Sequence, residues 1–208
     1  MTTNRIGRVV EVFADVCCPF THVGLRRFVE RRAAAGRNDV RLLVRAWPLE
    51  IVNGEPLDPA FIAEEVAEIR DQAAPTMFAG YTGVLPTSSL PAMAVAAAGY
   101  REGVDLGEDV SLRLRDLLFE LGRDLGDPAV LAKLAAEHHL AVSPEDDQRV
   151  LADHAEGVAR GVIGSPHFFT PSGGFFCPAL DVGRDDRGHL RVHADPEGFE
   201  RFLEACFT

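Results

Sequence analysis

The segments of the chain that predict β-strands lie near its two ends, and this order restricts the fold. Residues 9–13 are short, β-branched and aromatic, which predicts a buried strand, and residues 40–47 predict a second one. A helix is predicted between them, beginning at Pro19 and stopping near Gly36. Strand, helix and strand in this order predict a parallel βαβ unit, which belongs to the α/β class.

The middle hundred residues have helical patterns. Helices are predicted at about 58–73, 90–102, 107–122, 128–139 and 143–160, with loops at 48–59 and 74–91. Strands return at 166–170 and 175–180 around a turn at 171–174, and a last helix covers about 195–206. We therefore predict one α/β domain, residues 1–57 plus 161–208, with a large all-helical insertion at 58–160.

Charge and hydropathy exclude two classes of partner. The formal net charge of -11 over 208 residues argues against a nucleic-acid surface. No stretch approaches the roughly 20 apolar residues of a membrane span. The segment from Met1 to Arg8 is polar and lacks the apolar core of a signal peptide, so we expect a cytoplasmic protein with reduced thiols.

The chain has four cysteines, Cys17, Cys18, Cys177 and Cys206. They form no Cys-x-x-Cys pair and no cysteine–histidine cluster with zinc spacing, so no metal site is expected. Cys18 stands directly after the first strand and before the first helix, where helix amides would stabilise a thiolate and lower the thiol pKa. The alternative interpretation of Cys18 is a buried structural cysteine.

Residues 13–24, Phe-Ala-Asp-Val-Cys-Cys-Pro-Phe-Thr-His-Val-Gly, resemble the strand-to-helix signature of DsbA-like thioredoxin-fold proteins. In that group an aromatic residue and an Asp precede Cys-Pro-aromatic-Cys. The resemblance implies a thioredoxin fold, with Cys18 as the nucleophile and Pro19 and Phe20 between the two thiol positions. Thr21 stands where the group has its second cysteine, and its hydroxyl is expected to reach the Cys18 sulfur.

A second segment, Gly-Val-Ile-Gly-Ser-Pro-His-Phe-Phe at 161–169, resembles the Gly-Val-x-Gly-Val-Pro-Thr-Phe segment of the same group. There the proline is cis and lies against the active-site cysteine. The resemblance implies that Ser165 and Pro166 present backbone to a substrate and that His167 contacts it. The alternative is a proline that opens an edge strand. His22 is expected near the sulfur, or else as an exposed histidine of the first helical turn.

A dithiol enzyme uses its second cysteine to release a mixed disulfide, and Thr21 cannot do this. An outside thiol such as glutathione or mycothiol is one replacement, acting as a co-substrate and not as a tightly bound cofactor. Cys177 is a candidate resolving thiol, and so is Cys17, although a disulfide between adjacent residues 17 and 18 demands strained geometry.

Three functions are ranked on these grounds. The first is a thiol–disulfide oxidoreductase with a single nucleophilic cysteine, acting on a small-molecule thiol or a protein disulfide. The second is a glutathione- or mycothiol-dependent isomerase or transferase, because the DsbA-like group also contains 2-hydroxychromene-2-carboxylate isomerases and kappa-class glutathione transferases. The third is a non-catalytic thioredoxin-fold binding module. The oligomeric state stays open, with a homodimer among the alternatives.

Overall fold

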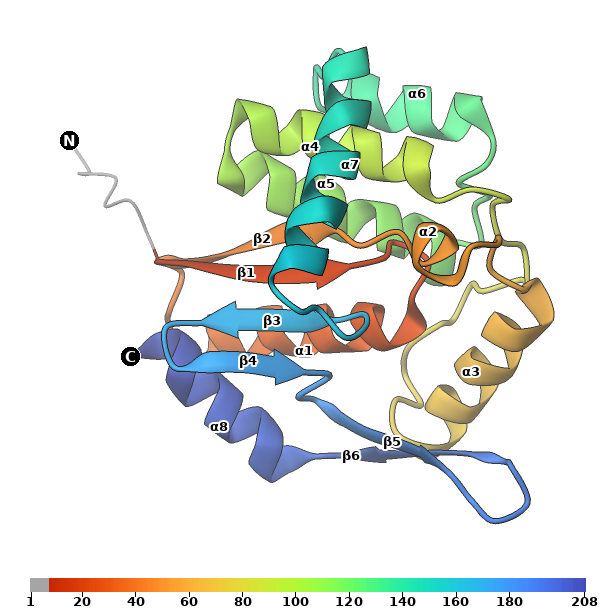
Figure 1. Cartoon of the computed structure of the whole chain (residues 1–208), viewed down its shortest axis with the longest axis vertical. Coiled ribbons are helices and arrows are strands. Elements are labelled where there is room, and N and C mark those ends of the chain that lie inside the picture. Colours follow the sequence, from red (N-terminus) through yellow and green to blue (C-terminus); the bar gives the residue numbers. More distant parts are fainter. Residues whose placement is uncertain (1–7) are drawn as a thin grey trace.

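The computed structural model describes residues 8–208 and contains a four-stranded sheet in the order β2-β1-β3-β4 (Figure 1). The strands are β1 (Arg8–Ala14), β2 (Val40–Ala46), β3 (His167–Thr170) and β4 (Gly173–Phe176). β1 is parallel to β2 and antiparallel to β3, and β3 is antiparallel to β4. Because α1 (Pro19–Ala34) connects β1 to β2, the predicted βαβ opening is confirmed.

One face of the sheet is covered by α1 and by α8 (Pro196–Phe207). Phe202 of α8 contacts Phe28 of α1 and Phe168 of β3, with ring centroids 5.7 and 4.6 Å apart. Alternate residues of β1 point to this core, because side chains alternate across a strand. The two helices and β3 are therefore joined by one aromatic cluster.

The other face carries a smaller apolar cluster of Phe13, Trp47 and Val162, against the end of α7 (Pro144–Ala159). A Cβ atom added at Gly157 of α7 would lie 2.6 Å from the Trp47 ring, so only glycine allows this close approach. The close contact positions the end of α7, and with it the loop that leads into β3.

Helices fill the chain between β2 and β3 (Figure 1). They are α2 (Leu49–Asn53), α3 (Pro59–Gln72), α4 (Leu90–Glu102), α5 (Val104–Phe119), α6 (Pro128–Glu137) and α7. α4, α5 and α7 pack against β2, at one edge of the sheet. α3 instead packs against α1 and against a second, two-stranded sheet formed by β5 (Leu180–Arg184) and β6 (Leu190–Ala194).

The structure differs from the sequence prediction in two places. The five-residue helix α2 lies inside the segment predicted as a loop, and Gly54 ends it with a φ of 76°. The predicted strand 175–180 ends at Phe176, and the β5–β6 hairpin follows, which was not predicted. The change of direction falls at Cys177, which has a positive φ of 44°.

The division of the chain into residues 1–57 plus 161–208 and an insertion at 58–160 stays a prediction, and residues 1–7 lie outside the described residues. The α/β fold with many inserted helices is confirmed. Within residues 8–208, no helix is both long enough and apolar enough to cross a bilayer.

Candidate active site

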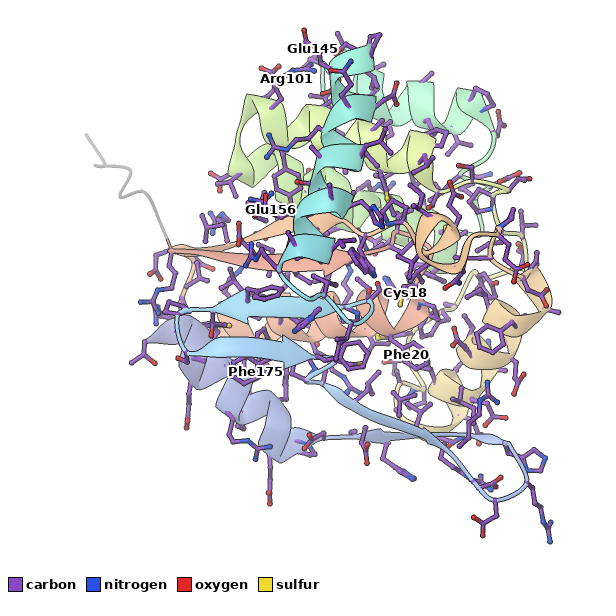
Figure 2. All side chains as sticks on the ribbon, in the orientation of Figure 1. Cys18, Phe20, Arg101, Glu145, Glu156 and Phe175 are labelled. Carbon is purple, nitrogen blue, oxygen red and sulfur yellow. The ribbon has the colours of Figure 1, made fainter. Side chains whose placement is uncertain are left out.

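Cys18 is the residue that joins β1 to α1. It takes the N-cap position of α1 with extended backbone angles, and Pro19 occupies the first helical turn. Its sulfhydryl group donates a hydrogen bond to the carbonyl oxygen of Ser165, with sulfur and oxygen 3.2 Å apart. Figure 2 shows Cys18 at the start of α1, beside the loop that leads into β3. Residues far apart in the sequence thus meet at this sulfur.

Ser165 holds the two halves of the site together. Its hydroxyl oxygen accepts a hydrogen bond from the backbone N–H of Asp15 at 2.9 Å and lies 2.8 Å from the hydroxyl oxygen of Thr21. The peptide bond between Ser165 and Pro166 is cis. The structure therefore brings together Cys18, Thr21, Ser165 and Pro166 from the two motifs that the sequence singled out.

A cavity of about 720 Å³ opens beside Cys18. Pro19 and Phe20 extend its wall along the start of α1, and Ser165 of the second motif and Cys177 after β4 also line it. The opposite wall is formed by α2, the following loop and α3. The other residues that line the cavity are Leu49, Asn53, Glu55, Pro56, Leu57, Asp58, Phe61, Ile62, Glu65, Phe176 and Val182. This volume falls within the range of small-molecule sites.

Burial dominates the ionisation of the Cys18 thiol. Cys18 is only 3% exposed, and burial raises its pKa to about 11. Thr21 and Ser165 act in the opposite direction through hydrogen bonding, whereas the carboxyl group of Glu65 raises the pKa further. The lowered pKa expected from the helix start is therefore wrong for this structure, because desolvation of the thiolate outweighs the helix amides and the hydroxyl groups.

Cys177 is the second cysteine of the cavity wall. Its backbone N–H donates to the carbonyl oxygen of Pro166 at 3.0 Å. Cys177 and Cys18 are therefore hydrogen-bonded to the adjacent residues Pro166 and Ser165. Cys177 is 8% exposed, and burial raises the pKa of its thiol to about 12. All four cysteines are free thiols in this structure.

Cys17 lies outside the cavity wall. It is 1% exposed within the main apolar core, and its backbone N–H donates to the Asp15 carboxylate at 2.7 Å. Burial raises the pKa of its thiol well above the ordinary value. Of the two candidate resolving thiols, only Cys177 shares the cavity with Cys18.

Asp15 is a structural support at the end of β1. Its fully buried carboxylate accepts hydrogen bonds from the backbone N–H groups of Cys17 and Leu49, both at 2.7 Å, and from the Ser89 hydroxyl at 3.2 Å. The buried guanidinium group of Arg115 donates to the Asp15 carbonyl oxygen at 3.1 Å. Asp15 thus fixes the end of β1 to α2 and to the start of α4.

His22 points to a different partner from the one expected. Its Nε2 lies 2.7 Å from a carboxylate oxygen of Glu120, and its ring contacts Phe78 and Phe119 at 5.3 and 5.1 Å between centroids. Burial lowers the His22 pKa, and the buried Nδ1 has no partner among the described residues. The cavity wall does not include His22 in the described part of the chain.

His167 begins β3, and it also stays outside the described cavity wall. Its ring stacks on Phe169 at 4.7 Å and meets Phe176 edge to face at 6.2 Å between centroids. Its Nδ1 accepts a hydrogen bond from the Ile163 N–H at 3.4 Å. The two histidines therefore have separate neighbours.

The sequence interpretation missed Glu65 as a residue of the site. It lies in α3 on the cavity wall, and burial raises its pKa to about 7. The spacing of Phe61, Ile62 and Glu65 on one helix face is the signal that places this carboxyl group beside apolar residues. No group of three or more His, Cys, Asp or Glu residues arranged for a metal ion occurs within residues 8–208.

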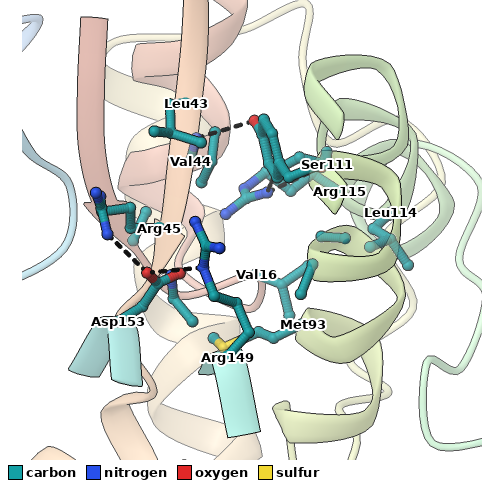
Figure 3. A pocket seen from close by; sticks show the side chains of 15 residues that line it. Val16, Leu43, Val44, Arg45, Met93, Ser111, Leu114, Arg115, Arg149 and Asp153 are labelled. Atoms are coloured by element: carbon teal, nitrogen blue, oxygen red, sulfur yellow. Dashed lines mark hydrogen bonds and ion pairs between the residues drawn. The ribbon is translucent and has the colours of Figure 1, made fainter. Parts of the chain in front are cut away.

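A second, much smaller cavity of about 20 Å³ lies between β2 and the helices α4, α5 and α7 (Figure 3). Arg45 and Arg149 both reach Asp153 there, with N–O distances of 2.9 and 3.6 Å. Its size is about that of one water molecule. We interpret it as a packing gap closed by ion pairs, and it shares no lining residue with the cavity beside Cys18.

The family is decided by a match over most of the chain. Residues 9–183 match the family model described as a DSBA-like thioredoxin domain. The chain belongs to the DSBA-like thioredoxin domain family. The DSBA-like match covers both motifs of the site, Cys-Pro-Phe-Thr and the Ser-Pro loop, and the inserted helices between them.

Solved structures agree with the DSBA-like fold. A cytosolic disulfide reductase, DsbM from Pseudomonas aeruginosa, has a TM-score of 0.62 at 17% identity and covers 94% of this chain and 97% of its own. A putative protein disulfide isomerase from Nitrosomonas europaea has a TM-score of 0.65 at 16% identity, with coverages of 95% and 96%. A 2-hydroxychromene-2-carboxylate isomerase has a TM-score of 0.60 at 14% identity, with coverages of 81% and 88%. A comparison with curated proteins found no match to this chain.

Proposed function

We propose that the protein is a thiol–disulfide oxidoreductase in which Cys18 is the single nucleophile of a Cys-Pro-Phe-Thr motif. The observation that carries the proposal is the position of Cys18. Its sulfur is hydrogen-bonded to the carbonyl oxygen of Ser165, the residue before the cis Pro166, and Cys18 lines a cavity of about 720 Å³. Thr21 stands at the second thiol position and supplies a hydroxyl group in place of a sulfur.

The first step is attack by the Cys18 thiolate on a disulfide sulfur of the substrate. A bond forms between Cys18 and that sulfur, the substrate S–S bond breaks, and the departing sulfur leaves as a thiolate that takes up a proton. Because the Cys18 pKa is about 11 before substrate binds, the thiolate is a minor species at neutral pH. Substrate sulfur is therefore attacked more slowly at neutral pH than at alkaline pH.

The second step releases the mixed disulfide. An outside thiol, such as glutathione or mycothiol, attacks the substrate sulfur, forms a new disulfide with it and releases the Cys18 thiolate. Alternatively, Cys177 attacks the Cys18 sulfur and expels the substrate as a thiolate, and an outside thiol then reduces the Cys18–Cys177 disulfide. The shared cavity and the adjoining carbonyl groups of Ser165 and Pro166 support Cys177 as the internal alternative. A solved structure of DsbM with GSH supports glutathione as an outside thiol.

The remaining residues of the site have supporting roles in this proposal. Pro19 and Phe20 form the wall against which the substrate packs. A substrate contact by the backbone of Ser165 and Pro166 stays a prediction. A substrate contact by His22 or His167 stays a prediction. We also propose that the protein works in the reducing cytoplasm, which its four free thiols and the cytosolic description of DsbM support.

The isomerase or transferase alternative is favoured by one observation. The cavity is large and partly apolar, as a site for a small organic substrate would be, and the Cys-Pro-Phe-Thr motif beside it contains one thiol. In that reaction Cys18 would bind or activate glutathione without net oxidation. The isomerase or transferase alternative therefore predicts that the protein does not turn over disulfides.

The test is a disulfide-reduction assay with bis(2-hydroxyethyl) disulfide and glutathione, coupled to NADPH through glutathione reductase. Cys18→Ser is expected to lose turnover, whereas Cys206→Ser, which changes a buried cysteine in α8, is expected to retain it. A Cys177→Ser variant separates the two release routes, because turnover by an outside thiol does not need it. If Cys18→Ser turns over as fast as the unmodified protein, the redox proposal is wrong.

A further inference from the structure

The cavity wall opposite Cys18 is formed largely by one face of α3. Asp58 at the N-cap and then Phe61, Ile62 and Glu65 follow the spacing that places side chains on one side of a helix. All four line the cavity that Cys18 also lines. The charge of this helix face therefore affects a ligand in the cavity that also contacts Cys18.

The charged side chains of the described wall are all acidic: Glu55, Asp58 and Glu65. Asp58 is engaged as a helix cap, because its carboxylate accepts the Ala60 N–H at 2.9 Å. Glu65 has no hydrogen bond or ion pair with any described residue, and a carboxylate that lines a cavity without a partner is free to contact a ligand.

The surroundings of Glu65 show how its charge is set. The guanidinium group of Arg184 on β5 favours the charged form, but it is engaged with the neighbouring Glu64 at 3.8 Å. Glu64 itself disfavours the charged form, and burial is the largest cause of the raised Glu65 pKa of about 7. Glu65 in turn raises the pKa of Cys18 on α1 and of Tyr81, so its charge is felt across the cavity.

We propose that Glu65 is a specificity-determining residue that makes the Cys18 cavity favour cationic disulfides and thiols and disfavour anionic ones. The proposal rests on the proposed exchange chemistry at Cys18 and adds the substrate class. A cationic group bound near the sulfur pairs with the Glu65 carboxylate, while a carboxylate at the same place is repelled. Phe61 and Phe176, which are 42% and 50% exposed, supply apolar contacts beside it.

Glutathione is a poor fit under this proposal, because it carries two carboxylates and one ammonium group. A neutral or basic thiol is the better outside thiol. The expected substrates are disulfides with an ammonium or guanidinium group a few bonds from the sulfur and an apolar portion that contacts the rim.

The experiment compares three symmetric disulfides that differ in charge: cystamine, bis(2-hydroxyethyl) disulfide and 3,3′-dithiodipropionate. Second-order rate constants for reduced full-length protein are measured from about pH 5.5 to pH 8.5, a range that spans the ionisation of a carboxyl group raised by burial. Each is divided by the rate constant of 2-mercaptoethanol with the same disulfide. Because every disulfide meets the same Cys18 thiolate, the ratio between two of them cancels its ionisation.

We expect the normalised cystamine to dithiodipropionate ratio to rise about tenfold over this range as Glu65 ionises. Glu65→Gln is expected to abolish most of that rise, whereas Glu64→Gln, which removes the same charge from the neighbouring position, is expected to retain it. If a folded Glu65→Gln variant shows the same rise of the cystamine to dithiodipropionate ratio with pH as the unmodified protein, the proposal is overturned. If that variant fails to fold, a flat ratio in the unmodified protein overturns it equally. Failure of all three disulfides to react would instead contradict the exchange chemistry itself.

Discussion

The sulfhydryl group of Cys18 donates a hydrogen bond to the carbonyl oxygen of Ser165, which lies 147 residues later in the chain, over 3.2 Å. This contact joins the start of α1 to the loop before β3. It leaves the thiol protonated and directed at the carbonyl group that neighbours Pro166. Loss of the proton and release of that carbonyl group therefore occur together when the sulfur reacts.

The first prediction concerns the pH dependence of Cys18. With a pKa of about 11, its alkylation by the neutral reagent iodoacetamide should accelerate about tenfold per pH unit between about pH 7 and 9. Peptide mapping by mass spectrometry, in a Cys17→Ser background, assigns the rate to Cys18. A rate that levels off at or below about pH 9 would show an ordinary or lowered pKa and contradict the prediction.

Glu65 predicts a pH dependence of stability. Its carboxyl pKa is about 7 in the folded protein, above the ordinary value of 4.5, so the folded state binds the proton more tightly than the unfolded state. This stabilisation is complete below about pH 4.5 and is lost as the pH rises through 7. Glu65→Gln should therefore gain up to about 3 kcal/mol of unfolding free energy relative to the unmodified protein between about pH 5 and pH 8.

Urea unfolding at both pH values measures that difference. Glu64→Gln is the matched control, because Glu64 sits one position earlier and is paired with Arg184. An equal stability difference at both pH values would show that Glu65 titrates normally.

The carboxylate of Asp15 predicts a large structural effect. Asp15→Ala removes the acceptor of two backbone N–H groups and one hydroxyl group in a fully buried place, which should cost about 2–4 kcal/mol. Asp58→Ala removes one exposed helix cap and should cost about 1 kcal/mol. Thermal and urea unfolding compare the two variants, and similar losses would rule out the anchoring role of Asp15.

Glu120 predicts the opposite pH dependence to Glu65. Burial raises its pKa, but hydrogen bonds from His22 and from the Phe78 and Ala79 N–H groups outweigh burial and lower it to about 2. Its contribution is therefore present above about pH 4.5 and is lost as the pH falls toward 2.

Glu120→Ala should lose about 1–2 kcal/mol of unfolding free energy at neutral pH, because solvent screens this partly exposed carboxylate, and the loss should shrink as the pH falls to about 2. Its disulfide exchange rate at Cys18 should be unchanged, since His22 contacts Glu120 and Phe119 rather than the cavity. A loss of exchange rate in a folded Glu120→Ala protein would implicate His22 in the reaction.

The residues that could be predicted from sequence are those with local signals. Strand patterns and the first-turn proline place Cys18 between β1 and α1, and the two motifs bring Ser165 and Pro166 to it. The pKa of Cys18 could not be predicted, because a helix start and a buried thiol have opposite effects, and burial depends on the long-range packing of α3 and the Ser165 loop.

His22 and Glu65 show that local sequence patterns do not reveal long-range neighbours. His22 was expected near the Cys18 sulfur and contacts Glu120, whereas Glu65 was not expected at the site and lines its cavity. The neighbour of His22 is Glu120, 98 residues later, which no local pattern indicates. Glu65 was hidden in a helix assigned to the insertion, whereas α3 packs against α1 and borders the site. The β5–β6 hairpin was missed because each strand is only five residues long, although Leu180 and Val182 in β5, and Leu190 and Val192 in β6, alternate with other residues.

Covalent capture at Cys18 tests the central claim most directly. Reduced protein carrying Cys17→Ser is mixed with bis(2-hydroxyethyl) disulfide, quenched with acid after a single turnover and mapped by mass spectrometry. We predict a mixed disulfide on Cys18, or a Cys18–Cys177 disulfide that becomes a Cys18 adduct when Cys177→Ser is added. A modification confined to Cys177 or Cys206, or none at all at alkaline pH, would contradict the account.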